Sequence, residues 1–171
     1  IIAKPLTKLF NKSLQSGKFP SPWKQANVTP IFKQKGSTSD PTNYRPISLL
    51  PNMSKILEKL VFGKIYGHII ENELLTEKQS GYRSNHSTHL QLLYLTHQLY
   101  TALNEKENFT AVFLDISKYF DKIWHEGLMK KCEIQYNVSG SLLDWLKSYL
   151  KDRTQVVRVG NSSSPPEKLL S

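Results

Sequence analysis

Asp115 stands at the end of a mostly apolar run, residues 109–116, and its position suits metal chemistry. A carboxylate there is costly to bury unless it pairs with a cation. Mg²⁺ prefers such hard oxygen ligands. The position alone leaves two interpretations open: a magnesium ligand, or an aspartate that caps the turn after a strand. Asp121 lies six residues further on. That is about 20 Å along a strand or about 9 Å along a helix, so Asp121 does not complete the same site.

Positive charge is distributed unevenly along the chain. With 23 Lys and Arg against 14 Asp and Glu, the net charge of the 171 residues is +9. Residues 1–39 hold no acidic residue and seven lysines, namely Lys4, Lys8, Lys12, Lys18, Lys24, Lys33 and Lys35. Such a block attracts phosphates in a salt-sensitive way. Charge alone leaves open a plain alternative, a solvated helix face followed by a basic loop.

Cysteine and histidine usage argues against several other classes of protein. The single cysteine, Cys132, excludes a disulfide scaffold, so we expect no disulfide partner and an intracellular protein of the cytoplasm or nucleus. No apolar run approaches the roughly 20 residues that cross a bilayer, so no membrane partner is expected. His86 and His89 lack a third ligand at a zinc spacing, and Cys132 is expected to be an idle thiol.

Apolar periodicity predicts an α+β chain of alternating helices and extended segments. Ser54 is expected to cap the second helix, and Ser141 with Asp144 to form a capping box at the last one. The run 109–116 predicts a central strand covered on both faces. The predicted helices are 3–16, 54–71, 86–104, 122–133 and 141–151, and the extended segments are 26–33, 44–50, 109–116 and 153–159.

Both ends of the chain are unusual. The first residues are Ile1 and Ile2 with no methionine, and the last follow a serine- and proline-rich loop at 162–166. We therefore expect both ends to be cuts through a longer protein.

Four segments carry motifs in a fixed order, and a fifth extends them: Pro22–Lys33, Asn43–Leu50 with Lys55–Glu58, Gln79–Arg83 with Ser87-Thr88, Phe113–Asp121 with Trp124-His125, and then Asp144–Leu150 with Arg153–Gln155. Together they resemble the reverse transcriptase domain of non-LTR (LINE-type) retrotransposons. The resemblance covers about residue 5 to residue 160, and its ordered set of motifs is more specific than any one of them. The string Asn43–Leu50, NYRPISLL, is the most characteristic.

The resemblance implies roles for residues around Asp115. In such polymerases two Mg²⁺ ions activate the primer 3′-hydroxyl and stabilise the leaving pyrophosphate. Asp115 would bind both ions, and the backbone carbonyl of Ile116 would help to bind the second. Phe120 matches the aromatic position that blocks a ribose 2′-hydroxyl, and Tyr119 would lie close to the sugar and triphosphate. The alternative for Phe120 is ordinary core packing.

Further implied roles concern the substrates. Lys33 and Arg45 would meet the incoming deoxynucleotide triphosphate, because both bring positive charge and Arg can engage two oxygens at once. Gln79, Gly81 and Arg83 would touch the template backbone. The partners implied for the full-length protein are an RNA template, a DNA primer and deoxynucleotide triphosphates. The implied fold is a truncated right hand, with fingers over residues 1–108 and the start of the palm over 109–171.

Two departures from the family pattern bear on activity. Tyr119 replaces a small residue, usually Ala, and its ring would obstruct the nucleotide pocket unless it swings away. The family's later PQG segment and its paired-aspartate segment do not occur in these 171 residues. One aspartate does not hold two Mg²⁺ ions, so we expect this chain alone not to polymerise DNA. Two alternatives stay open: a decayed or domesticated remnant that only binds RNA, and a polymerase resembling group II intron maturases.

Overall fold

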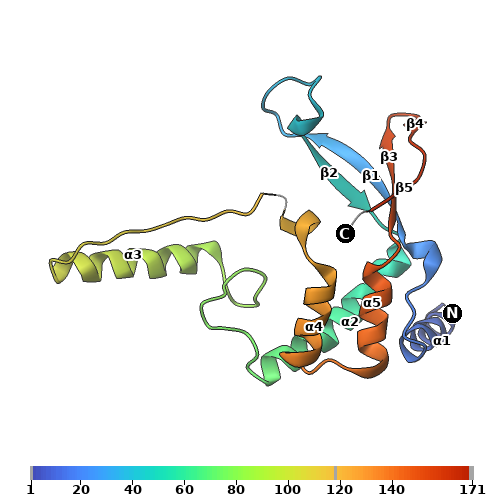
Figure 1. The fold of residues 1–171 in the computed structure, drawn as a ribbon, viewed down its shortest axis with the longest axis horizontal. Coiled ribbons are helices and arrows are strands. Elements are labelled where there is room, and N and C mark those ends of the chain that lie inside the picture. The colour runs from blue at the N-terminus through green and yellow to red at the C-terminus, as the bar shows by residue number, and fades with distance from the viewer. Residues whose placement is uncertain (1, 118, 170–171) are drawn as a thin grey trace.

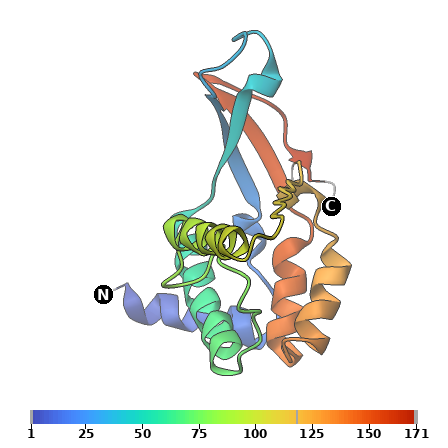
Figure 2. The same cartoon turned by 90° about the vertical axis from the view of Figure 1, so that its left-hand side faces the viewer.

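The computed structural model describes residues 2–117 and 119–169 as an α+β chain, in agreement with the predicted fold class. A mixed sheet stands above a group of helices, and one long helix extends away from both (Figures 1 and 2). The helices are α1 Ala3–Gln15, α2 Asn52–Glu71, α3 Thr88–Asn104, α4 His125–Ile134 and α5 Gly140–Leu150. The strands are β1 Gln25–Phe32, β2 Tyr44–Leu49, β3 Thr154–Val159, β4 Ser162–Ser163 and β5 Glu167–Lys168.

The sheet is built around β1, which pairs antiparallel with β2 and parallel with β3. Strand β3 also pairs antiparallel with β4 and β5. The predicted extended segments 26–33, 44–50 and 153–159 are therefore confirmed as strands of one sheet. The parallel β1–β3 pair joins the start of the described chain to its end, a contact that local patterns do not predict.

Two prolines face each other across the β1–β2 hairpin without breaking it. Pro30 is the register partner of Pro46, and the Lys33 N–H donates to the Asn43 carbonyl at 2.8 Å. Because bonded and non-bonded pairs alternate, the proline pair falls where N–H groups point away from the partner strand. Pro30 therefore lacks its donor on the β3 side, and parallel pairing ends at Val28.

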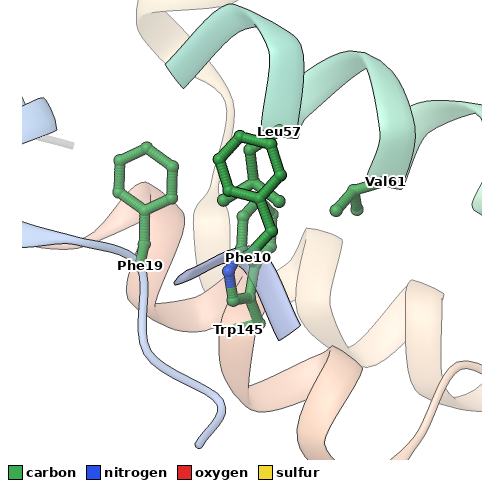
Figure 3. Packing of buried hydrophobic residues seen from close by; sticks show 5 residues of the cluster. All are labelled: Phe10, Phe19, Leu57, Val61 and Trp145. Atoms are coloured by element: carbon green, nitrogen blue, oxygen red, sulfur yellow. The ribbon is translucent and has the colours of Figure 1, made fainter. Parts of the chain in front are cut away.

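The main core forms where α1, α2 and α5 meet (Figure 3). Its buried members are Phe10, Phe19, Leu57, Val61 and Trp145. Figure 3 shows the rings of Phe19 and Phe10 gathered around the Trp145 indole, with Leu57 and Val61 supplied by α2. Three elements that are far apart in the sequence thus share one apolar centre.

Two predictions about helix starts are wrong. Ser54 does not cap α2, which begins at Asn52 after Pro51; Ser54 is fully buried within the first turn and its hydroxyl donates to the Glu58 carboxylate. At α5 the N-cap residue is Ser139, with no side-chain capping bond. The predicted capping box at residues 141 and 144 is absent there, because the helix starts earlier than its polar pattern indicates.

A second, smaller core joins α4 to α5. Met129, Val138 and Leu143 are buried there. His68 of α2 contacts this region through Nε2, which lies 2.8 Å from the Tyr136 carbonyl oxygen. The two cores and this contact therefore join α1, α2, α4 and α5 in one packed group of helices.

The predicted central strand over 109–116 is wrong in this structure. The segment is extended but pairs with no strand among residues 2–117 and 119–169. Its side chains face solvent, with Val112 76%, Phe113 82% and Leu114 91% exposed. Together with α3 it forms an arm that extends from the body (Figure 1). Its apolar composition is that of a covered strand, and the covering layers are not supplied by the described residues.

Candidate active site

Lys33 and Arg45 lie together on the β1–β2 hairpin. Arg45 is the register partner of Ile31, and Lys33 follows Ile31 by two residues, so both cations point to the same face of the hairpin. The Lys33 Nζ donates to the Thr42 carbonyl at 2.7 Å, and Arg45 is exposed. The two cations are diagonal neighbours near the hairpin tip, where they can meet one polyanion.

The loop between these strands is held by its own side chains. The Asp40 carboxylate accepts from the Thr42 N–H at 2.9 Å and from the Thr42 hydroxyl at 2.8 Å. These hydrogen bonds lower the pKa of Asp40 from its ordinary value. Gly36 has φ +82°, and a Cβ there would lie 2.5 Å from the Asn43 Nδ2 atom. Lys33 and Arg45 therefore flank a loop that is held by its own side-chain hydrogen bonds.

Asp115 and Ile116 lie on the exposed extended segment. The Asp115 carboxylate is a ligand of the type that Mg²⁺ prefers. No group of three or more His, Cys, Asp or Glu side chains lies together in the part of the chain that the structure describes. Asp115 and Ile116 therefore do not form a complete metal site with other described residues.

Three aromatic rings bring two predicted motifs together. The Phe120 ring centroid lies 5.4 Å from that of Tyr119 and 6.4 Å from that of Tyr82, both in edge-to-face geometry. Tyr82 belongs to the 79–83 loop and has a left-handed φ of +58°. Lys118, within the same motif as Asp115, lies outside the described residues. The structure thus places the 79–83 loop beside Phe120, and Phe120 is exposed rather than packed in the core.

Several hydrogen bonds hold the 79–83 loop to the neighbouring helices. Ser80 Oγ donates to Gln91 of α3 at 2.7 Å, and the Ser84 N–H donates to the Tyr66 hydroxyl of α2 at 2.9 Å. The half-buried Arg83 donates to the Thr76 carbonyl at 3.1 Å. Gln79 and Gly81 are exposed. In this conformation Arg83 organises the loop, whereas Gln79 and Gly81 are open to a ligand.

The structure divides the basic residues of the first quarter into separate surfaces. Lys33 and Lys35 lie at the tip of the hairpin, whereas Lys4, Lys8 and Lys12 lie on α1, among the helices below the sheet (Figures 1 and 2). The sequence shows one continuous basic block. Lysines that recur every four residues, as at positions 4, 8 and 12, lie on one face of a helix. This spacing could have predicted that they form a surface apart from the hairpin lysines.

Arg153 has a packing role that its motif does not reveal. Its guanidinium carbon lies 4.8 Å from the Tyr149 ring centroid and 5.7 Å from that of Phe19. Its Nη1 donates to the Tyr149 carbonyl at 3.0 Å. This cation–π contact fixes the end of α5 against the start of β3.

Comparison with known proteins identifies the family. Residues 31–169 match the family described as reverse transcriptase (RNA-dependent DNA polymerase), so the chain belongs to the reverse transcriptase family. Within it, the chain is a segment of the reverse transcriptase domain of LINE-like, non-LTR retrotransposons. This confirms the resemblance and favours it over the maturase-like alternative.

Three similar proteins come from Drosophila melanogaster. The chain is 38% identical over 161 residues to the "Probable RNA-directed DNA polymerase from transposon BS", covering 94% of the chain and 18% of that protein. It is 36% identical over 159 residues to the corresponding X-element protein and 34% over 159 residues to that of mobile element jockey, each time covering 93% of the chain and 17% of the relative. The chain therefore spans less than a fifth of the length of these relatives.

The structure adds one observation on membranes. None of its described helices is both long and apolar enough to span a bilayer.

Proposed function

We propose that this chain forms the fingers and the start of the palm of an RNA-directed DNA polymerase with the right-hand fold. The fingers would comprise residues 1–108 and the palm would begin at residue 109. The observation that carries the proposal is the family match over residues 31–169, which includes both the hairpin cations and the Asp115 motif. RNA template, DNA primer and deoxynucleotide triphosphates are the proposed partners, and the cytoplasm or nucleus is the proposed location.

The hairpin and the Asp115 segment would have separate roles, in nucleotide binding and in metal binding. Lys33 and Arg45 would bind the triphosphate of the incoming nucleotide, and their common face on the hairpin supports this role. Asp115 and the Ile116 carbonyl would contribute ligands to Mg²⁺, which activates the primer hydroxyl and stabilises the leaving group when bound. The second carboxylate segment would have to come from outside these 171 residues.

The aromatic residues and the loop beside them would shape the nucleotide pocket. Phe120 would exclude a ribose 2′-hydroxyl by steric contact, and the neighbouring Tyr119 would narrow the space for the sugar. Gln79, Gly81 and Arg83 would contact the template backbone. The exposure of Gln79 and Gly81 supports this role, whereas Arg83 would first have to release the Thr76 carbonyl.

A chimaera tests the proposal. This chain replaces the matching segment of the BS transposon polymerase, and primer extension on an RNA template is measured with Mg²⁺ and deoxynucleotides. We expect extension by the chimaera, loss to background with Asp115→Asn, and retention with the matched control Asp121→Asn. A folded chimaera that binds template and primer without extending them, or whose activity survives Asp115→Asn, would contradict the proposal.

The same assay distinguishes the alternative of an RNA-binding remnant. The purified 171-residue chain is expected to show no incorporation, because one carboxylate does not hold two metal ions. In the chimaera, Tyr119→Ala is expected to raise incorporation if the ring narrows the pocket. A remnant without catalysis would leave the chimaera inactive with and without Tyr119→Ala. Clear incorporation by the chain alone would overturn the expectation that it lacks a complete metal site.

A further inference from the structure

The orientation of α1 is determined by its apolar face. Phe10 and Ser13 are buried, and Leu6 and Leu14 pack against the core formed with α2 and α5. The Trp145 Nε1–H donates to the Ser13 hydroxyl at 2.9 Å, which fixes the rotation of the helix. The opposite face of α1 is therefore directed away from the body.

That outer face is a shallow groove whose polar side chains are suited to phosphate. Lys4, Lys8 and Lys12 line it, together with Asn11 and Gln15. The lysines recur every four residues, which places their Cα atoms about 6 Å apart along the helix axis. Lysine, asparagine and glutamine are side chains that contact nucleic-acid phosphates. No acidic residue occurs in residues 1–39, so no carboxylate of α1 itself opposes an anion in the groove.

This charge pattern works against the stability of the helix. Like charges four residues apart repel each other, and a lysine in the first turn opposes the helix dipole. The first turn of α1 holds no acidic residue and its N-cap makes no side-chain hydrogen bond. Within the part of the chain that the structure describes, no ion pair involves these lysines. These lysines therefore oppose the stability of the helix, and residues that oppose stability are typical of functional surfaces.

The groove's chemistry distinguishes between two anionic partners. A helix that binds a membrane surface inserts its apolar face into the lipid, but the apolar face of α1 is buried in the protein core. The groove holds no aromatic ring or arginine that could stack on a base. These features favour a phosphodiester backbone that is bound without sequence preference.

We propose that the outer face of α1, lined by Lys4, Lys8 and Lys12, binds the phosphodiester backbone of a nucleic acid. Helix α1 lies among the helices below the sheet, away from the tip of the β1–β2 hairpin, near which Lys33 and Arg45 are found (Figures 1 and 2). The outer face of α1 is a second contact, separate from the proposed polymerase centre. Catalysis is not needed for it, so its test is independent of the test of the proposed function.

The salt dependence of binding tests the proposal on the chain itself. Fluorescence anisotropy follows fluorescein-labelled oligouridine of about 16 nucleotides, the upper end of known single-strand site sizes, across a salt series. Loss of three phosphate contacts reduces the magnitude of the negative slope of log K, the association constant, against log salt by about 2. This change weakens binding roughly 100-fold at about 0.1 M salt. We expect this loss for the triple variant Lys4→Gln, Lys8→Gln, Lys12→Gln. Oligothymidine of equal length is expected to behave alike, because both strands present the same phosphates.

A matched variant removes the same charge elsewhere. Lys106→Gln, Lys122→Gln and Lys168→Gln alter three exposed lysines outside α1 and are expected to leave the slope nearly unchanged. Circular dichroism checks that both triple variants keep the wild-type helix content and melting temperature. An unchanged slope in a folded α1 variant would overturn the proposal, as would an equal loss in the matched variant. Loss of oligouridine binding without loss of oligothymidine binding would overturn the backbone-only mode.

Discussion

The hydroxyl of Ser13 joins three parts of the chain. It accepts from the Trp145 indole N–H at 2.9 Å and donates to the Lys18 carbonyl at 2.6 Å. Trp145 is almost wholly buried, so water cannot replace this acceptor. One small polar side chain therefore fixes how α1 and the following turn pack on α5.

Ser13→Ala is expected to destabilise the chain by about 1–3 kcal/mol, because it leaves a buried indole donor without a partner. Chemical denaturation followed by tryptophan fluorescence measures this change in unfolding free energy. Ser16→Ala is the control, since the exposed Ser16 hydroxyl donates only to the Ser13 carbonyl; we expect a change within about 0.5 kcal/mol. Equal effects of the two substitutions would contradict the argument.

Tyr149 links stability to alkaline pH. Burial raises the pKa of its hydroxyl above the ordinary value of 10.0, and the Glu58 carboxylate raises it further, while Arg153 opposes the shift. The folded state thus keeps Tyr149 neutral at a pH where the unfolded chain has already lost the proton. Its contribution is fully present below pH 10 and is lost as pH rises through the folded pKa.

We expect the unfolding free energy of the wild type to fall above pH 10, and Tyr149→Phe to reduce that fall. Urea denaturation at a series of alkaline pH values provides the measurement. Tyr100→Phe, at an exposed tyrosine of α3, is the control and should keep the wild-type dependence. A decline of the same steepness in the Tyr149→Phe variant would count against this assignment.

At the scale of elements, the β1–β2 hairpin depends on local geometry. The paired prolines leave the ladder between the two strands intact, and Gly36 supplies a left-handed turn in contact with Asn43. Pro46 leaves the outer edge of β2 without one donor, which discourages the addition of another strand. The strand register and the loop conformation of this hairpin thus determine where Lys33 and Arg45 lie.

Gly36→Ala is expected to destabilise the chain by about 1 kcal/mol or more, because a Cβ would meet the Asn43 side chain at a left-handed φ. Gly63→Ala in α2 is a contrasting control, since a Cβ there meets no atom within 4 Å. In a helix interior this change is expected to stabilise by about 0.5–1 kcal/mol. Thermal melts of both variants give the comparison, and a stabilised Gly36→Ala variant would refute the explanation.

At the scale of the whole molecule, the arm formed by α3 and residues 109–116 is its least covered part. Apolar side chains occur around much of α3, including the exposed Leu92, Leu93, Tyr100 and Leu103. A helix that is apolar on several sides is typical of a buried environment. An exposed apolar extended segment beside it offers free backbone groups to another strand.

The isolated chain is expected to self-associate through residues 109–116. Leu114→Lys should lower the aggregated fraction in light scattering and analytical ultracentrifugation, because a charge opposes strand addition. Ile134→Lys, at a residue of α4 that is 78% exposed, adds the same charge outside the arm and should have little effect. If both substitutions suppress association alike, net charge rather than the arm is responsible.

Much of the local structure was predictable from residue patterns. The helices α1, α2, α3 and α5 and the strands β1 to β3 follow from apolar spacing and from the prolines and glycines between them. Helix starts were less predictable, since the buried Ser54 resembles a cap in type and position. The strand over 109–116 was predicted from composition, but a strand also needs partners, and composition does not supply them.

For the candidate site, the sequence by itself determined the family and the identity of the proposed residues, because motif order is a property of the chain. Only the tertiary structure decided which of them meet. Strand register places Lys33 and Arg45 on one face, loop contacts bring Tyr82 to Phe120, and packing of α1 separates its lysines from the hairpin. These outcomes depend on contacts between residues far apart in the chain, whose free energy is set by shape and burial rather than by local spacing.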